Sequence, residues 1–259
     1  MPTALITGAS TGLGRSLATA LVARGWHVII TARGEERLNS VAEQLKSSGH
    51  PPGRDEPITP SVIALAGDIA DPDHRARLVA TIGPTGSLDL LINNASTLGP
   101  AQPGHPPLRR LAALSPETLT EVLTVNVIAP FGLTAALLPA LDRAAGIVID
   151  ISSDAAVQHY PEWGGYGASK AALDHLTLTF GVENLDIACY AVDPGDMRTA
   201  MQQSAFPGED ISDRRSPDDV VPALLELIAS RPPSGRYRAI DLLDSSDSGA
   251  SDTTAVRAP

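Results

Sequence analysis

Cysteine is almost absent from this chain, and the spacings typical of metal ligands are missing. Its 259 residues include one cysteine, Cys189, and its six histidines form no H-x-x-x-H pair. A single cysteine can form neither an intramolecular disulfide nor a cysteine-based metal site, and we therefore expect no disulfide and no bound metal. The apolar neighbours of Cys189 indicate that it lies in a buried strand.

Positive charge and long apolar runs are also scarce. The chain has 19 Lys and Arg against 30 Asp and Glu, for a net charge of −11. This balance argues against nucleic acid or an anionic membrane as a partner. No apolar run reaches the roughly 18 residues of a membrane span, and the first residues lack the basic segment of a signal peptide. We therefore expect a cytoplasmic protein without membrane contact.

Short apolar runs alternate along the chain with segments of helical periodicity. The runs are almost continuously apolar, as is typical of parallel strands buried on both faces. This order predicts a single α/β domain over residues 1–244, with a Rossmann-like, doubly wound parallel sheet of about seven strands and helices on both faces. The predicted strands are Thr3–Thr7, His27–Thr31, Ser61–Ala66, Leu88–Asn93, Gly146–Ser152, Asp186–Val192 and Tyr237–Leu242.

Three segments without regular periodicity follow predicted strands: residues 96–114, 154–165 and 196–216. We expect them to be the loops that shape a substrate pocket, because parallel-sheet sites form at the carboxyl ends of strands. A helix is predicted from Ser115 toward Leu141, with an interruption at Pro130. Residues 245–259 are rich in Ser, Asp, Ala and Thr, and we expect a disordered tail there.

The stretch TGASTGLG, Thr7–Gly14, lies between the first predicted strand and the first predicted helix. Glycines in such a turn let the backbone approach a pyrophosphate, which the amides of the helix N-terminus can bind. The alternative is a plain glycine-rich turn, but the position in an alternating chain favours a dinucleotide site.

The second predicted strand ends in Thr-Ala-Arg. Ala32 stands where a dinucleotide site would carry an acidic residue for the ribose hydroxyls, and Arg33 follows it. An arginine can bind a 2′-phosphate through charge-assisted hydrogen bonds. We therefore expect NADP(H) in preference to NAD(H), the alternative being that Arg33 is a solvated loop residue.

Further motifs follow in a fixed order, and together they resemble those of the classical short-chain dehydrogenase/reductase family over about residues 3–242. Ser153 precedes Tyr166 by thirteen residues, and Lys170 follows Tyr166 by four. The family usually has a glycine where this chain has Ser96. The motifs are GDIAD at Gly67–Asp71, NNAS at Asn93–Ser96, VNV around Asn126, ISS at Ile151–Ser153, YGASK at Tyr166–Lys170 and DPGDMRT at Asp193–Thr199.

The resemblance implies a set of site residues and an oligomer, either a homodimer or a homotetramer. The implied catalytic residues are Asn126, Ser153, Tyr166 and Lys170. The expected cofactor-binding residues are Gly8, Ser10, Thr11, Gly12, Leu13, Gly14, Arg33, Asp68, Ile69, Asn94, Ala95, Tyr166, Lys170, Pro194, Gly195, Met197 and Thr199.

The chemistry of these residues suits proton transfer to a carbonyl. A phenol has a pKa near ~10, and we expect Lys170, one helical turn after Tyr166, to lower it. Ser153 can donate a hydrogen bond to the developing oxyanion. Pro130 cannot donate to the backbone carbonyl of Asn126, which we expect to hold a water that relays protons to Lys170.

The sequence thus predicts an NADP(H)-dependent oxidoreductase that moves hydride between the nicotinamide and a small carbonyl or secondary alcohol. The alternative is a non-catalytic dinucleotide sensor on the same fold, since fold does not fix function. A sensor would not need all four catalytic residues. The expected substrate-contacting residues are Ser153, Trp163, Tyr166 and Met201, although Trp163 could equally be a packed loop aromatic. No motif names the substrate.

Overall fold

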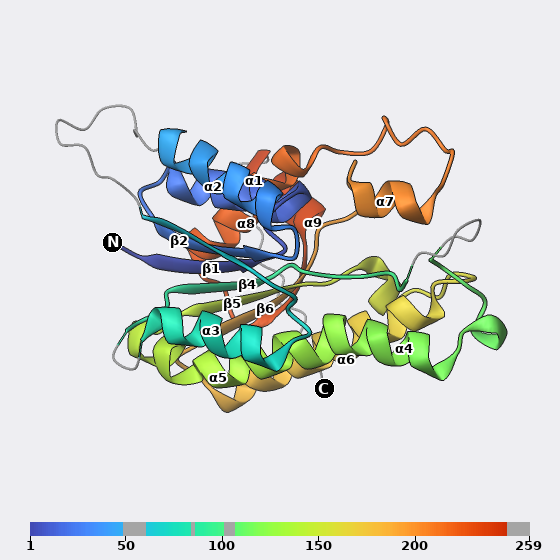
Figure 1. The fold of residues 1–259 in the computed structure, drawn as a ribbon, viewed down its shortest axis with the longest axis horizontal. Coiled ribbons are helices and arrows are strands. Elements are labelled where there is room, and N and C mark those ends of the chain that lie inside the picture. The colour runs from blue at the N-terminus through green and yellow to red at the C-terminus, as the bar shows by residue number, and fades with distance from the viewer. Residues whose placement is uncertain (49–60, 84–85, 101–106, 248–259) are drawn as a thin grey trace.

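The computed structural model describes residues 1–48, 61–83, 86–100 and 107–247. Within these ranges, seven parallel strands form one sheet in the order β3-β2-β1-β4-β5-β6-β7 (Figure 1). The predicted doubly wound α/β fold is confirmed. The strands are β1 (Thr3–Thr7), β2 (His27–Ala32), β3 (Val62–Ala66), β4 (Leu90–Asn93), β5 (Ile147–Ile151), β6 (Ala188–Asp193) and β7 (Gly235–Arg238).

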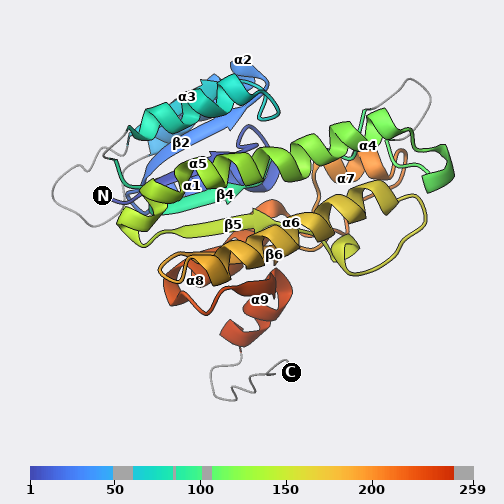
Figure 2. The same ribbon diagram turned by 90° about the horizontal axis from the view of Figure 1, so that it is seen from below.

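Helices cover the sheet in two layers, with α1, α2, α8 and α9 on one face and α3, α5 and α6 on the other (Figures 1 and 2). Each layer buries its own apolar cluster against the sheet. Leu17 of α1 and Leu133 of α5 are both fully buried. The longer helices are α1 (Gly12–Val22), α2 (Glu35–Ser48), α3 (Pro72–Ile82), α4 (Pro116–Leu123), α5 (Ala129–Ala144), α6 (Gly164–Glu183), α7 (Ala200–Ala205), α8 (Pro217–Ser230) and α9 (Ala239–Asp247).

The strand order reverses direction at β1, which pairs with β2 on one side and with β4 on the other. The connections that follow β1 and β4 therefore run to opposite faces of the sheet. In a doubly wound fold this divergence opens a crevice at the carboxyl ends of the strands, where ligands bind.

The helix expected from Ser115 toward Leu141 forms, but Pro130 does not interrupt it. A π-helical turn, Thr124–Ile128, joins α4 to α5, and the helix continues to Ala144. Because Pro130 has no N–H, it cannot make the usual bond to the carbonyl four residues earlier. The wider turn directly before it accommodates this missing donor.

The stretch Pro116–Ala144 has the length and apolar composition of a membrane-crossing helix, with a mean hydropathy of 1.8 over its most apolar 18 residues. Of its most apolar stretch of 18 residues, 44% is buried, and α5 packs against α3, β4 and β5. Packing in the core of the domain accounts for this composition.

Two loop expectations and the last strand need correction. The final strand is β7, Gly235–Arg238, and the helix α9 follows where the strand was expected to continue to Leu242. This helix reaches Asp247, so the first three residues of the expected tail are helical, and the rest, residues 248–259, lie outside the described part of the chain. The segment 196–216 contains the helix α7, and 96–114 contains a 3₁₀ turn at Leu111–Ala113. Residues 101–106 of the latter also lie outside the described ranges.

Candidate active site

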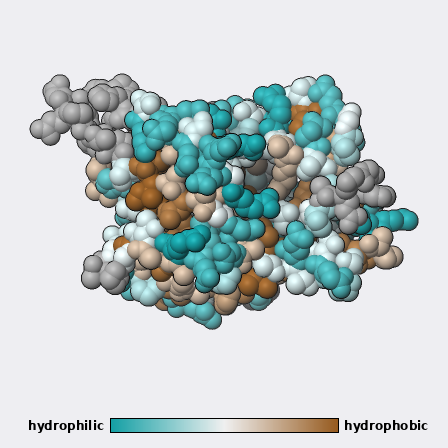
Figure 3. All heavy atoms as spheres, in the orientation of Figure 1, coloured by the Kyte–Doolittle hydropathy of each residue, from teal (hydrophilic) through white to brown (hydrophobic). Residues whose placement is uncertain are grey.

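A cavity of about 1190 Å³ opens at the carboxyl ends of the strands. The space-filling view shows this part of the surface hollowed between the two helical layers (Figure 3). Of the residues predicted for the site, all but Gly14 and Asn126 line the cavity. Those that line it are Gly8, Ser10, Thr11, Gly12, Leu13, Arg33, Asp68, Ile69, Asn94, Ala95, Ser153, Trp163, Tyr166, Lys170, Pro194, Gly195, Met197, Thr199 and Met201.

The glycine-rich loop is held by the amide of Asn94, which follows β4. Asn94 Nδ2 donates to the carbonyls of Thr7 at 2.9 Å and Gly8 at 3.2 Å. A Cβ on Gly14 would lie 2.5 Å from this nitrogen and 2.6 Å from the Gly8 oxygen. Gly8 also has φ +68°, a conformation that favours glycine. Gly14 therefore shapes the loop from behind the cavity instead of lining it.

The hydroxyl of Thr7 joins the loops after β1 and β4. Its Oγ1 accepts hydrogen bonds from the backbone N–H groups of Asn94 and Ala95, both at 3.0 Å. Helix α1 begins next to this joint, and the side chain of Thr11 does not cap its first amides. Thr11, Gly12 and Leu13 line the cavity, where the uncapped amides of a helix start suit a phosphate group.

Two arginines stand at the end of the cavity next to β2. Arg33 follows β2, and Arg37 lies in the first turn of α2; both side chains are exposed and line the cavity. Asp68 lies across this end, after β3, where its Oδ1 accepts from the N–H of Ala70 at 2.9 Å. Arg37 was not predicted from the sequence, although its position four residues after Arg33 could have revealed it.

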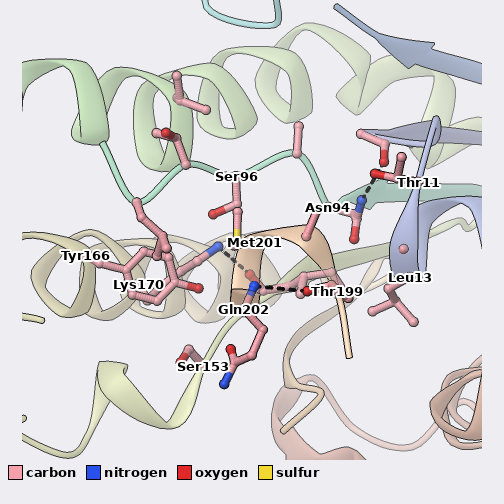
Figure 4. Close-up of a pocket in the computed structure, with 18 of the residues that line it drawn as sticks. Thr11, Leu13, Asn94, Ser96, Ser153, Tyr166, Lys170, Thr199, Met201 and Gln202 are labelled. Atoms are coloured by element: carbon pink, nitrogen blue, oxygen red, sulfur yellow. Dashed lines mark hydrogen bonds between the residues drawn. The ribbon is translucent and has the colours of Figure 1, made fainter. Parts of the chain in front are cut away.

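Ser153, Tyr166 and Lys170 meet at the other end of the cavity (Figure 4). Tyr166 and Lys170 lie one turn apart on α6 and are 8% and 2% exposed. Lys170 Nζ donates to the backbone carbonyl of Ile151 at 2.7 Å and lies 5.6 Å from the ring centroid of Tyr166. Ser153 Oγ donates to Asp154 Oδ1 at 3.0 Å and accepts from the N–H of Ala155 at 3.2 Å.

The electrostatics of Tyr166 differ from the prediction. Burial raises the pKa of its phenol above the ordinary value, whereas hydrogen bonds with Ser96 and Ser153 lower it. Desolvation prevails over the hydrogen bonds, and the Lys170 ammonium lies beside the ring instead of at the hydroxyl. Burial in turn lowers the pKa of Lys170 to about 8, opposed by the carboxylates of Asp150 and Asp174.

Asn126 lies in the π-helical turn with its side chain 1% exposed, so it does not line the cavity. Its Oδ1 accepts from Ser96 Oγ at 3.1 Å and from the N–H of Thr97 at 2.8 Å. Its Nδ2 donates to the Thr97 carbonyl at 2.9 Å and to Ser169 Oγ at 3.0 Å. The side chain thus fixes the segment after β4 against α6, and the water expected at its backbone carbonyl stays a prediction.

The three predicted pocket segments converge beside Tyr166. They contribute one apolar cluster, and Trp163 contacts Tyr166 edge-on at 5.7 Å and Phe206 at 6.0 Å between ring centroids. Trp163 therefore packs against the neighbouring rings and also lines the cavity. It is a packed loop aromatic that is also placed to contact a substrate. The cluster consists of Leu98, Leu108, Ala155, Trp163, Tyr166, Met201 and Ala205.

Acidic side chains also line the cavity, and most of them were not predicted from the sequence. Apart from Lys170, the only cations among the described lining residues are the two arginines next to β2. The carboxylates come from segments that share no motif, which explains why sequence patterns did not reveal the group. The acidic lining residues beyond Asp68 are Glu117, Glu121, Asp154, Asp193 and Asp196.

Across the described ranges, no cluster of three or more His, Cys, Asp or Glu side chains has an arrangement that could hold a metal ion. Cys189 lies buried in β6, as its apolar neighbours indicated. Burial raises the pKa of its thiol to about 12, so the thiol stays protonated at neutral pH.

The fold and this cavity define a doubly wound α/β protein with a dinucleotide-sized crevice and a Ser-Tyr-Lys group beside it. A family model described as short chain dehydrogenase matches residues 2–210. The chain therefore belongs to the short-chain dehydrogenase family of oxidoreductases.

Individual relatives agree with this assignment. An uncharacterised oxidoreductase of Escherichia coli K12, YciK, is 34% identical over 228 residues, covering 86% of this chain and 84% of the relative. Serine 3-dehydrogenase of Agrobacterium fabrum is 36% identical over 181 residues, covering 68% of this chain and 63% of that protein. A short chain dehydrogenase of Escherichia coli CFT073, solved with NADPH, has a TM-score of 0.79 at 31% identity, covering 92% of this chain and 96% of the other.

Proposed function

We propose that this protein is an NADP(H)-dependent oxidoreductase acting on a small carbonyl or secondary alcohol, with Tyr166 as general acid and base. The observation that carries the proposal is the meeting of Ser153, Tyr166 and Lys170 in the cavity that also contains the glycine-rich loop. The same cavity thus contains a loop suited to binding a dinucleotide and a side chain that can donate a proton.

Tyr166, Ser153 and Lys170 each have a separate role in carbonyl reduction. Bound NADPH would supply the hydride. Tyr166 donates its phenolic proton to the carbonyl oxygen, and Ser153 donates a hydrogen bond to the same oxygen as negative charge develops. Lys170, anchored on the Ile151 carbonyl, places its ammonium beside the phenol ring and favours the phenolate that remains. In the oxidative direction the same groups act in reverse.

The preference for NADP(H) rests on the arginines at the end of the cavity next to β2. Arg33 and Arg37 are exposed and line the cavity without a carboxylate at the end of β2 to hold the ribose hydroxyls. Two guanidinium groups suit a 2′-phosphate. The structures of two relatives, from Escherichia coli CFT073 and Shigella flexneri, were solved with NADPH and NADP, which supports this preference.

The charge around Tyr166 favours neutral or cationic substrates over anionic ones. Glu117, Glu121, Asp154 and Asp196 contribute negative charge to the lining, and Lys170 is the one cation near the proton donor among the described residues that line the cavity. A carboxylate or phosphate on the substrate would be repelled there. Trp163 and its neighbours offer an apolar contact for the rest of the molecule.

A panel of ketones and aldehydes tests this proposal through the loss of NADPH absorbance. Each neutral compound should be paired with an analogue of equal size that carries a carboxylate. We expect turnover of some neutral members and at least tenfold lower kcat/KM for the paired anions. Tight NADPH binding without turnover in either direction would favour the sensor alternative, and faster turnover of the anions would contradict the substrate class.

We also propose that the protein forms a homodimer or homotetramer and acts in the cytoplasm. Apolar side chains exposed on and beside α5 and α6 support the oligomer: Phe131 is 45% exposed, Val182 72% and Leu185 88%. Sedimentation velocity of the purified protein, beside a Phe131→Glu variant, would test the oligomer, and a uniformly monomeric wild type would contradict it.

A further inference from the structure

The serine that the proposed mechanism turns toward the substrate already has a partner for its hydrogen. Ser153 Oγ donates to Asp154 Oδ1 at 3.0 Å, and it accepts from the N–H of Ala155 at 3.2 Å. Figure 4 shows Ser153 at the end of the cavity where Tyr166 and Lys170 lie, and Asp154 lines the same cavity. A hydroxyl has one hydrogen, so Ser153 cannot donate to Asp154 and to a substrate oxygen at the same time.

Asp154 is held in place by its side chain and by its backbone. The Tyr160 hydroxyl donates to Asp154 Oδ2 at 2.8 Å and shares its hydrogen with Gln158 Oε1. The backbone carbonyl of Asp154 accepts from the N–H groups of Val157 at 2.9 Å and Gln158 at 2.8 Å. Because none of these bonds involves Oδ1, the carboxylate stays in place when the Ser153 hydroxyl turns away.

Turning the Ser153 hydroxyl toward a substrate takes this donor away from Asp154 Oδ1. A hydrogen bond to a carboxylate is roughly twice as strong as one between neutral groups, so its loss is unfavourable. Asp154 is half-buried, which limits the water that can replace the hydrogen. A plain ketone brings only an acceptor to the site, whereas a ketone with its own hydroxyl or ammonium group brings a donor that can take the place of Ser153.

The distances place that donor on the carbon next to the reacting carbonyl. A substrate oxygen that accepts from Ser153 lies about 3 Å from Oγ, and Asp154 Oδ1 lies 3.0 Å from the same atom. Ordinary bond lengths put a hydroxyl or amino group on the adjacent carbon about 3 Å from the carbonyl oxygen when both point the same way. The four polar atoms then close a ring in which each neighbouring pair is at hydrogen-bond distance.

The charge of the cavity agrees with such a group. Asp193 and Asp196 also line the cavity, and the ammonium of Lys170 donates to the Ile151 carbonyl at 2.7 Å. A carboxylate on the substrate would be repelled by these aspartates, whereas an ammonium group would be attracted by them. The site therefore suits a donor that is neutral or positively charged.

We propose that Asp154 is a substrate-specificity residue, whose carboxylate accepts a hydrogen bond from a hydroxyl or ammonium group on the carbon next to the reacting carbonyl. The substrates are then α-hydroxy or α-amino carbonyl compounds, and their reduction gives vicinal diols or amino alcohols. This inference rests on the proposed function, because it names the substrate class for the same Ser153 and Tyr166.

Three ketones of equal size test the inference: butanone, hydroxyacetone and aminoacetone. Because their intrinsic reactivities differ, the measured quantity is the ratio of kcat/KM for each donor-bearing ketone to that for butanone, compared between wild type and Asp154→Ala. We expect the variant to lower both ratios by about 10- to 100-fold, the range for a hydrogen bond to a charged group. Equal ratios in the two proteins would overturn the proposal.

Two further variants separate the hydrogen bond from the charge. Asp154→Asn keeps the size of the side chain and an acceptor oxygen, so the hydroxyacetone ratio should fall less than the aminoacetone ratio. Asp196→Ala is the matched control, since it removes a carboxylate that lines the same cavity but follows β6. It should lower the hydroxyacetone ratio far less than Asp154→Ala does. An equal loss would assign the preference to the general charge of the cavity and overturn the role of Asp154.

A binding measurement covers the case in which no carbonyl is reduced. Ligand-observed NMR gives the affinities of the same three ketones for the NADP⁺ complex, in which none of them can be reduced. Tighter binding of hydroxyacetone and aminoacetone than of butanone, lost in Asp154→Ala, would uphold the inference while the proposed function failed. Turnover with ratios that do not depend on Asp154 would uphold the proposed function and overturn the inference, and equal affinities without turnover would overturn both.

Discussion

Arg236 of β7 donates from Nη2 to the backbone carbonyl of Ser153 at 2.9 Å, which ties the edge strand to the serine that we propose as a hydrogen-bond donor to the substrate. The same guanidinium pairs with Asp174 of α6 at 2.9 Å and lies 3.6 Å from Asp193 at the end of β6. Both carboxylates are at most 10% exposed. One arginine thus holds three elements that meet beneath the site.

Replacing Arg236 by methionine should lower the free energy of unfolding by about 3 kcal/mol, because it leaves two buried carboxylates without their cation. Urea unfolding measures the change. Arg238→Met is the control, since the Arg238–Asp241 pair is about 60% exposed on both sides and should contribute less than about 1 kcal/mol. Equal losses in the two variants would contradict the role given to Arg236.

Replacing Gly14 by alanine should weaken both folding and cofactor binding, because the new methyl group would collide with Asn94 Nδ2 and the Gly8 carbonyl. We expect a loss of about 1–3 kcal/mol in unfolding free energy. Gly132→Ala in α5 is the matched control, since its Cβ would find only the Arg75 side chain, at 3.6 Å. That change should be neutral or slightly stabilising. Thermal unfolding with and without NADPH distinguishes the two glycines.

Replacing Arg33 by alanine should weaken NADPH binding about 10- to 100-fold and leave NADH binding nearly unchanged, because only NADPH carries the 2′-phosphate. Titration of both cofactors by fluorescence measures the two affinities. Arg37→Ala should show the same selectivity to a smaller or similar degree. If the affinity for NADPH survives in the double variant, the arginines do not bind the phosphate.

Lys170 makes stability depend on pH in a defined window. Burial lowers its pKa from 10.5 to about 8, so the folded state binds this proton less tightly than the unfolded state. Below about pH 8, the free energy of unfolding is reduced by the full cost of burying the ammonium. This reduction becomes smaller as the pH rises from about 8 toward 10.5. Wild type should therefore gain up to about 3 kcal/mol over Lys170→Met across that window.

Paired urea titrations of the two proteins at several pH values measure this difference and cancel shared contributions from the buried thiol and phenols. If the difference in unfolding free energy between the two proteins stays constant with pH, the ammonium is not desolvated. A difference that falls with rising pH would show that neighbouring carboxylates dominate, with Asp150 and Asp174 as the nearest candidates.

Much of the fold followed from the sequence because the central strands are buried on both faces. Runs such as Thr3–Thr7 must be apolar throughout, and this makes them easy to find. The edge strand β7 is the exception, since Gly235–Arg238 pairs on one side only and carries two arginines. The apolar residues after it belong to α9, so the sequence pattern indicated a strand that begins two residues too late and ends four residues too late, and it missed the helix.

The spacing of Ser153, Tyr166 and Lys170 predicted that they lie together, as they do, but it could not predict their electrostatics. The four-residue interval between Tyr166 and Lys170 predicts a shared helix face, and they do share it. The interval does not reveal that Lys170 donates to the Ile151 carbonyl, or that burial is the main influence on the pKa of the Tyr166 phenol. Contacts such as Ser96 with Asn126 join residues 30 positions apart, and only the folded chain brings them together.

The central claim is that Tyr166 transfers the proton, and Tyr166→Phe tests it most directly. Removing the hydroxyl leaves the ring and its contact with Trp163 in place, so NADPH affinity measured by titration should change less than about threefold. With any carbonyl that wild type reduces, kcat should fall by about 10²–10⁴, the range for loss of a general acid. Turnover within a few-fold of wild type, with the same substrate and intact NADPH binding, would contradict the account.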